Sequence, residues 1–228
     1  MTVGIDKYPY YTNVISTFFD GDESPNNVKT KVRSGFIISE DYVLTHFDPY
    51  LDAEVSSNYT IEVLADASKY EATLVRGQKF VLFKLDGTIQ SDSLAHRIQL
   101  LDADKSPKPG DQVNIVDLQY NKINSTYGIM SINNVTLKDG QEDCIRIHSG
   151  AFGSSDDCKD SVFLESFDIP CKDSVISKSL VIQGQLAGLY ETTMYLKDGR
   201  EVASYLNLAH LNDKIKELIG ELKLYRGD

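Results

Sequence analysis

A regular series of short β-branched and aromatic runs is the feature that most constrains the fold of this chain. The runs are rich in Val, Ile, Phe, Tyr and Thr, and Gly, Asp, Asn and Pro separate them. They lie at Lys31–Ser39, Tyr42–Phe47, Tyr59–Leu64, Tyr70–Val75, Lys79–Leu85, Arg97–Leu101, Gln112–Leu118, Ile129–Leu137, Val162–Glu165, Leu180–Ile182, Gln185–Glu191 and Val202–Leu208. Such spacing is typical of all-β sandwiches and of paired barrels. The sequence therefore predicts an all-β fold.

One helix is predicted, at the C-terminal end. Ile215, Leu218, Ile219 and Leu222 recur at the helical spacing i, i+3, i+4 and i+7. Either Asn212 or Asp213 is expected to cap its start. We expect the helix near residues 211–223.

The segment Leu101–Pro109 divides the strand series in two, because it combines Asp, Lys, Ser and two prolines. We therefore expect an N-terminal barrel over residues 2–103 and a second barrel over residues 104–208. Residues 209–228 would form the helix and tail of the same unit.

The charge of the chain argues against several classes of partner. Its 228 residues include 23 Lys and Arg against 34 Asp and Glu, a formal net charge of −11. An acidic surface repels phosphate groups, so nucleic acid and anionic membranes are not expected partners. No apolar run approaches the roughly 20 residues of a membrane span. The start Met1–Asp6 does not resemble a signal peptide, so we expect a mature or recombinant form from which any signal peptide is missing.

The cysteines argue against two kinds of site, and the glycosylation motifs favour a secreted protein. None of the three cysteines lies in a C-x-x-C pair, which argues against a zinc ribbon or a thioredoxin-type site. The motif N-x-[ST] occurs at Asn58, Asn124 and Asn134, and all three are candidate glycosylation sites. A cytosolic protein with buried thiols is the alternative.

Several segments follow one another in an order known from one protein family. Ser34–Thr45 is similar to a Gly-Gly-Ser-Ile-Ile strand followed by an aromatic-Val-Leu-Thr strand. Gln78–Leu85 is similar to Asn-Asp-Ile-Ala-Leu-Ile-Lys-Leu, and Gly188–Tyr190, Tyr205–Leu208 and the terminal helix follow. Over nearly its whole length the chain thus resembles the trypsin-like (chymotrypsin-fold) serine proteases. The resemblance implies a double β-barrel with a C-terminal helix.

The family's catalytic residues are replaced in this sequence. The resemblance puts Asp48 at the general-base histidine, Lys79 at the orienting aspartate and Val175 at the serine nucleophile, with Ile176 as the alternative register. A carboxylate has a pKa of about 4 and is a poor acceptor for a serine proton at neutral pH. An ammonium group cannot orient an imidazole. We expect Asp48 and Lys79 to form an inverted ion pair instead.

The oxyanion hole and the specificity pocket also depart from the family's pattern. Asp173 stands at the glycine of the oxyanion hole, where a carboxylate repels a developing oxyanion. Ile169 takes the bottom of the pocket, and Thr193 and Ala203 replace its two glycine walls, which narrows the slot. Glu191–Thr192 replaces the Ser-Trp pair that lines the substrate backbone.

The resemblance also bears on the disulfides and on activation. Arg33 and Pro49 replace both halves of one family disulfide. The spacing of Cys144–Cys158 equals that of a disulfide loop common in trypsins, which implies that this pair is bonded and that Cys171 is a free thiol. Ser174 stands at the carboxylate that receives the amino terminus of an activated protease, so the activation switch is expected to be lost.

These replacements imply a proteolytically inactive homologue. The lost triad, disulfides and activation residues resemble the inactivated, group 3 allergen-like serine protease paralogues of scabies mites. That resemblance implies a secreted monomer without a cofactor, which binds host proteins and interferes with complement.

Two other functions compete with this interpretation. One is an active serine endopeptidase with a non-standard dyad, in which Ser174 or Ser177 would use His46 or His148 as base. The other is a secreted storage or structural β protein. A metal site with His46 and Asp48 as ligands is not expected, because no residues show ligand spacing.

Overall fold

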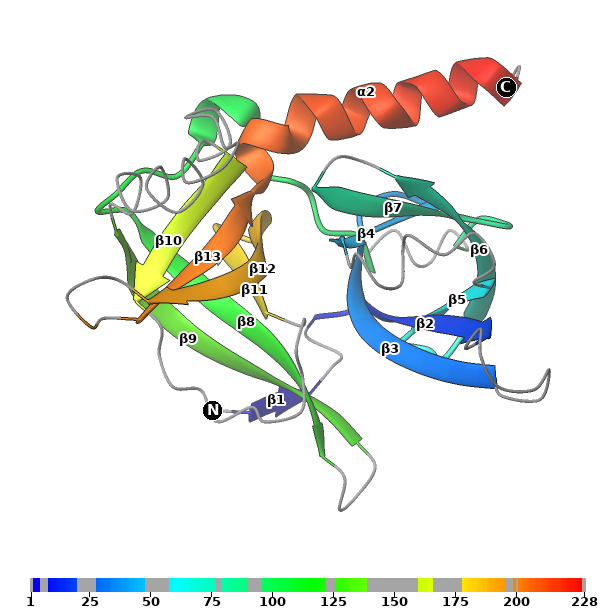
Figure 1. Ribbon diagram of the computed structural model, residues 1–228, viewed down its shortest axis with the longest axis horizontal. Coiled ribbons are helices and arrows are strands. Elements are labelled where there is room, and N and C mark those ends of the chain that lie inside the picture. The colour runs from blue at the N-terminus through cyan, green and yellow to red at the C-terminus, as the bar shows by residue number, and fades with distance from the viewer. Residues whose placement is uncertain are drawn as a thin grey trace. The chain divides into compact units, whose positions relative to one another are not determined.

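The chain folds into two compact β units followed by one long helix (Figure 1). The computed structural model describes residues 2–4, 8–19, 28–47, 58–76, 79–89, 96–121, 126–138, 160–165, 178–195, 199 and 201–226. The first unit takes in the described residues of Met1–Ile98 and Leu118–Met130. The second takes in those of Gln99–Asp117, Ser131–Pro170 and Lys178–Asp228.

Six antiparallel strands close the barrel of the first unit. They are β2 (Tyr11–Phe19), β3 (Val28–Ile37), β4 (Tyr42–His46), β5 (Asn58–Val63), β6 (Lys69–Arg76) and β7 (Phe80–Leu85). They pair in the order β2-β3-β4-β7-β6-β5. Val14, Val43, Ile61 and Phe83 fill the interior together with other apolar residues, as the alternation of side chains in a barrel requires.

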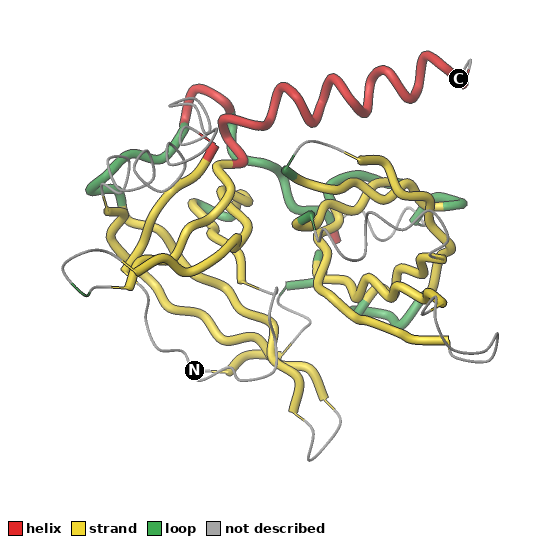
Figure 2. The backbone as a smooth tube through the Cα atoms, in the orientation of Figure 1, coloured by secondary structure: helices red, strands yellow, loops and turns green. Residues whose placement is uncertain are grey.

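A second sheet contains the remaining strands. They are β1 (Thr2–Gly4), β8 (Gln112–Asn121), β9 (Thr126–Lys138), β10 (Ser161–Glu165), β11 (Lys178–Ile182), β12 (Gln185–Tyr195) and β13 (Glu201–Asn207). Their order is β1-β9-β10-β13-β12-β11-β8, and β8 also pairs with β9. The strands β8–β13 therefore close into a second six-stranded barrel. The backbone tube in Figure 2 shows both barrels as strand-dominated, which confirms the predicted all-β double barrel.

Two glycines that carry the family resemblance lie where the packing leaves no room for a side chain. A Cβ on Gly35 would lie 2.6 Å from Val43 Cγ1 and 2.7 Å from Thr12 Oγ1. A Cβ on Gly188 would lie 2.9 Å from the carbonyl oxygen of Leu206. Close packing of neighbouring strands thus explains both glycines.

The helix α2 (Leu208–Arg226) is longer than predicted at both ends. The expected cap at Asn212 or Asp213 is wrong, because the backbone N–H of His210 donates to Oδ1 of Asn207 at 3.3 Å. Asn212 lies inside the helix, where its Nδ2 donates to the carbonyl oxygen of Leu101 at 2.8 Å. A short 3₁₀ turn, η3 (Ala103–Lys105), contacts the same helix.

Two strand predictions need correction. Arg97–Leu101 is not a strand, since Leu100 makes only an isolated bridge with Leu186. β1 and β2 were not predicted, although β2 pairs with both β3 and β5 and completes the first barrel.

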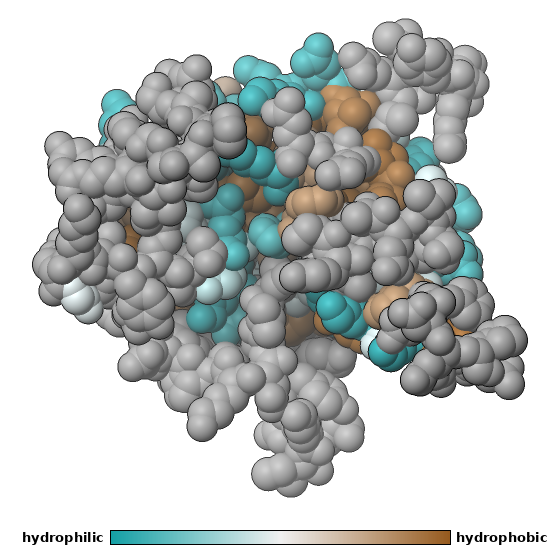
Figure 3. All heavy atoms as spheres, in the orientation of Figure 1, coloured by the Kyte–Doolittle hydropathy of each residue, from teal (hydrophilic) through white to brown (hydrophobic). Residues whose placement is uncertain are grey.

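The described surface combines hydrophilic and hydrophobic side chains. On the face shown in Figure 3, hydrophilic residues line much of the described surface. No helix among the described residues has the length and apolar character needed to cross a membrane.

Candidate functional site

In the first unit, Lys79 is the described residue that the resemblance assigns to the triad aspartate. It lies immediately before β7, and β7 pairs with β4 through Phe80 and His46. The register therefore brings Lys79 to the end of the barrel where β4 ends. An ammonium group at this position cannot accept the N–H of a catalytic imidazole or stabilise an imidazolium. With lysine at this position, no carboxylate is present there to orient a catalytic histidine.

His46 ends β4 and is half-buried. Its backbone carbonyl accepts a hydrogen bond of 3.1 Å from Nη1 of Arg33, and the guanidinium of Arg33 lies 5.4 Å from the ring centroid of Phe83. Arg33 is 6% exposed. A buried arginine therefore links β3 to the end of β4, at the position where the resemblance places one cysteine of a lost disulfide.

The other predicted triad and oxyanion positions lie outside the described residues. They are Asp48, Asp173 and Val175, with the alternative Ile176. The expected ion pair between Asp48 and Lys79 therefore stays a prediction. The same holds for the bottom of the pocket at Ile169 and for the alternative dyads, because Ser174, Ser177 and His148 are also outside that part of the chain.

In the second unit, the two residues predicted as pocket walls are register partners on neighbouring strands. Thr193 on β12 pairs with Ala203 on β13, and Ala203 also pairs with Leu164 on β10. The methyl group of Ala203 is buried in the apolar core of this barrel, beside Leu164 and Leu180. A side chain thus occupies the position to which the resemblance assigns a pocket glycine.

Glu191 forms a hydrogen-bonded group that the sequence did not indicate. It lies on β12 at a register irregularity between Tyr190 and Thr192. Its Oε2 accepts hydrogen bonds from Ser161 Oγ at 2.8 Å and from Ser204 Oγ at 2.7 Å. The half-buried carboxylate therefore ties β10, β12 and β13 together. The resemblance puts it where the family's serine contacts the substrate backbone, so a negative charge now stands there.

Next to this carboxylate along β12 and β13, half-buried Tyr190 contacts buried Tyr205. Tyr190 and Tyr205 pack edge to face with ring centroids 5.6 Å apart, and the Lys178 ammonium lies 5.4 Å from the Tyr190 ring centroid. Burial raises the pKa of Tyr205, and the charge of buried Asp117 raises that pKa further. Large aromatic side chains therefore fill this part of the second barrel.

The described sequons lie on the surface. Asn58 begins β5 and is exposed, and Asn134 is exposed on β9 with φ of 57°. The third sequon, Asn124, and the cysteines Cys144, Cys158 and Cys171 lie outside the described residues. Within the described ranges, no group of three or more His, Cys, Asp or Glu side chains is arranged to hold a metal ion.

Sequence reasoning missed the partners of Glu191 and Arg33. Ser204 follows Ala203 directly, so assigning β13 to the strand opposite Glu191 would have found one hydroxyl. Nothing in the sequence places Ser161 beside it, since that contact depends on how β10 pairs with β13. The hydrogen bond from Arg33 to the backbone carbonyl of His46 could not be predicted either, because every residue type has such a carbonyl.

Comparisons with known proteins agree with this architecture. No protein-family model matches the chain, and no curated protein matches it significantly by sequence. Several solved structures match nearly its whole length, among them the following three. GrC has a TM-score of 0.65 at 13% identity, over 96% of this chain and 97% of its own. The scabies mite inactivated protease paralogue S-I1 has 0.63 at 15%, over 97% and 98%.

Kallikrein-related peptidase 10 is also similar, with a TM-score of 0.60 at 16% identity over 95% of this chain and 98% of its own. At such low identity the likeness establishes the fold and not the activity. The predicted resemblance in fold is confirmed: this chain has the trypsin-like fold, with two antiparallel β-barrels and a C-terminal helix.

Proposed function

We propose that this chain is a secreted, proteolytically inactive homologue of trypsin-like serine endopeptidases that acts by binding proteins of a host, complement components among them. The observation that carries the proposal is Lys79 immediately before β7, at the position that the resemblance assigns to the orienting carboxylate of an active protease. A lysine there removes the orienting group of the triad.

Glu191 and Ala203 support the loss of substrate binding. The Glu191 carboxylate is engaged by two serine hydroxyls, and Ala203 fills a position that the family keeps open. Both changes lie on β12 and β13 and act independently of the triad. Similarity to S-I1, which is an inactivated protease paralogue of the scabies mite, agrees with this interpretation.

Inactivity is tested with a serine-reactive fluorophosphonate probe and a broad fluorogenic peptide library, with trypsin as the positive control. We expect neither labelling nor turnover. The variants Ser174→Ala and Ser177→Ala are labelled in parallel. Labelling of the wild type that either substitution abolishes would identify a non-standard nucleophile and establish the alternative function, an active endopeptidase.

Binding is tested by capture from host serum on the immobilised chain, with trypsin inactivated at its own serine as the matched control. We expect retention of host proteins that the control does not retain, together with reduced complement-mediated lysis when the chain is added to serum. Equal retention by both proteins and unchanged lysis contradict the proposed binding function.

Secretion is tested through the thiols. A Cys144–Cys158 disulfide and a free Cys171 predict one reactive thiol under denaturing, non-reducing conditions. Three reactive thiols in protein purified from its natural source contradict both the pairing and an oxidising compartment.

A further inference from the structure

The first half of β3 extends beyond the packed part of the first barrel. Val28–Val32 are all exposed, whereas the five residues from Arg33 to Ile37 are buried. Because neighbouring side chains of a strand point to opposite faces, five exposed residues in succession mean that both faces are open. β2 pairs with this half from Ile15 to Phe19, so it is an ordered hairpin strand. We call Val28–Val32 the arm.

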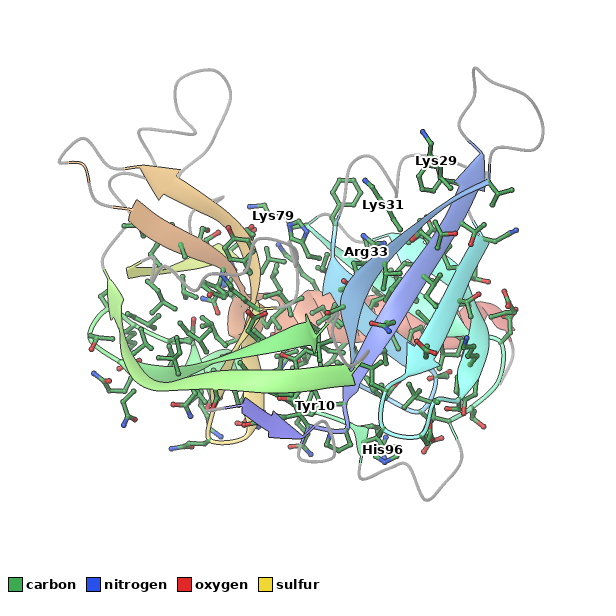
Figure 4. The ribbon with its side chains drawn as sticks, turned by 90° about the horizontal axis from the view of Figure 1, so that it is seen from below. Tyr10, Lys29, Lys31, Arg33, Lys79 and His96 are labelled. Atoms are coloured by element: carbon green, nitrogen blue, oxygen red, sulfur yellow. The ribbon has the colours of Figure 1, made fainter. Side chains whose placement is uncertain are left out.

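The two faces of the arm differ in chemistry. Lys29 and Lys31 share a face with Arg33, because these residues are two apart along the strand. Val28 and Val32 lie on the opposite face and are 52% and 57% exposed. Arg33 directly follows the arm, and its side chain is held by a hydrogen bond to the backbone carbonyl of His46. Figure 4 shows Lys29, Lys31 and Arg33 following one another along β3.

The arm is basic in a strongly acidic chain. β3 contains three basic residues and no acidic one, and its partner β2 contains no charged residue at all. The whole chain has a formal net charge of −11. An acidic partner is therefore repelled by most of the protein and attracted locally by the arm.

The outer edge of the arm also suits an extended ligand. In the part of the chain that the structure describes, β3 pairs with β4 only at Phe36 and Ile37. An extended segment laid along a strand edge presents alternate side chains to the two faces of the sheet. A segment in which acidic and apolar residues alternate would place carboxylates beside Lys29 and Lys31 and apolar groups beside Val28 and Val32.

We propose that the arm binds an extended acidic segment of a partner protein, with alternating Asp or Glu and apolar residues. This inference deepens the proposed binding function, on which it rests, because it names the surface and the chemistry of the partner. The proposed binding depends on the exposure of Val28–Val32 and on the positive charge of Lys29 and Lys31. It does not require these lysines to lose the contacts that they make within the chain.

The test uses a fluorescein-labelled peptide of alternating Glu and Val, with a peptide of alternating Lys and Val as the control ligand. Binding is followed by fluorescence anisotropy at low salt. The variant Lys29→Gln/Lys31→Gln is compared with Lys69→Gln/Lys108→Gln, which removes the same charge from two other exposed lysines. The variant Val28→Thr/Val32→Thr tests the apolar face without altering side-chain shape.

We expect saturable binding of the acidic peptide only, weakened about fivefold to tenfold by the arm lysine variant and left unchanged by the control variant. The threonine variant should also bind more weakly. Equal affinity of the arm and control variants, equal binding of both peptides, or no saturable binding overturns the proposal. Tighter binding of a sulfated polysaccharide or an anionic vesicle than of the peptide also overturns it.

Edge lysines also protect sheets against self-association. Sedimentation of the arm lysine variant distinguishes this role: oligomer formation with unchanged peptide binding overturns the proposal.

Serum capture separates this inference from the proposed function. If the wild type and the arm variant retain the same host proteins, the binding function stands and the arm is not its surface. If neither retains any, but the peptide result holds, the arm stands and the proposed function fails.

Discussion

Nη1 of Arg33 donates a hydrogen bond to the backbone carbonyl oxygen of His46 across 3.1 Å, in a largely buried position. The contact links β3 to the end of β4, where the described pairing of the two strands is limited to Phe36–Leu44 and Ile37–Val43. The resemblance places a disulfide at this position in active proteases. A charged hydrogen bond and an aromatic ring under the guanidinium thus stand where a covalent link is expected.

Replacing Arg33 should therefore destabilise the protein. Arg33→Met keeps an unbranched apolar stem and removes the charged guanidinium, and we expect the free energy of unfolding to fall by about 1.5–3 kcal/mol. The control is Lys69→Met, which breaks an exposed ion pair with Glu62 worth about 0–1 kcal/mol. Urea denaturation measures both, and equal losses would show that the contact with His46 adds nothing.

The carboxylate of Glu191 should stabilise the second barrel through both of its serine partners. We expect Ser161→Ala and Ser204→Ala each to lower the free energy of unfolding by about 1–3 kcal/mol, because each hydroxyl donates to a carboxylate. A double-mutant cycle of each serine with Glu191→Gln measures the coupling. Additive losses would indicate that the serines act independently of Glu191.

Gly35 should not tolerate even a methyl group. Gly35→Ala forces a Cβ into contact with Val43, Thr12 and Val14 at 2.6–2.8 Å, so we expect a loss of about 1–3 kcal/mol in the free energy of unfolding. Gly220→Ala is the matched control: apart from the adjoining helix backbone and its chain neighbours, no heavy atom lies within 4 Å of its added Cβ, and helix propensity should raise stability by about 0.5–1 kcal/mol. A stable Gly35 variant would contradict the close approach of the strands.

Alkaline pH should destabilise the protein through Tyr205. Burial raises the pKa of its hydroxyl above the ordinary value of about 10, and Asp117 raises it further. Above about pH 10 the unfolded chain releases a proton that the folded chain keeps, so stability falls by up to about 1.4 kcal/mol per pH unit. Tyr205→Phe removes this loss.

The measurement compares chemical denaturation of the wild type and the Tyr205→Phe variant from about pH 9 to pH 12, with the difference at pH 7 as reference. Burial also raises the pKa of Tyr10, with a smaller contribution from Tyr8, so Tyr10→Phe should reduce the same slope independently. Parallel stability curves for the wild type and the Tyr205 variant would contradict a raised pKa at Tyr205.

The sequence predicted the strand pattern well because alternating apolar residues report which side chains are buried. The same signal does not report pairing. Ile98 and Leu101 are buried, yet their segment bonds to Leu186 at one bridge without forming a ladder. β2 also carries β-branched and aromatic residues, such as Val14 and Ile15, and could have been recognised from them.

The candidate site was less accessible to sequence reasoning, because its chemistry depends on pairing across strands. The position of Lys79 before β7 followed from a local motif. The link between Glu191 and Ser161 joins residues 30 apart and requires the order of β10, β13 and β12. The helix start shows the same limit: Asn207 caps it only because β13 ends there.

Repairing the triad should not restore proteolysis. The variant carries Asp48→His, Lys79→Asp and Val175→Ser. Asp173 would still stand where the resemblance places the glycine of the oxyanion hole, and loss of one oxyanion donor alone costs about 2.7–4 kcal/mol. Thr193 and Ala203 would still stand where the resemblance places the two glycines of the pocket, and misplacing a substrate by about 1 Å costs roughly another hundredfold. The active conformation would still lack the carboxylate that Ser174 replaces. Because these losses multiply, hydrolysis of a peptide ester by the variant should equal that of the parent chain. Turnover well above the parent would show that the cleft is better preserved than its residues indicate.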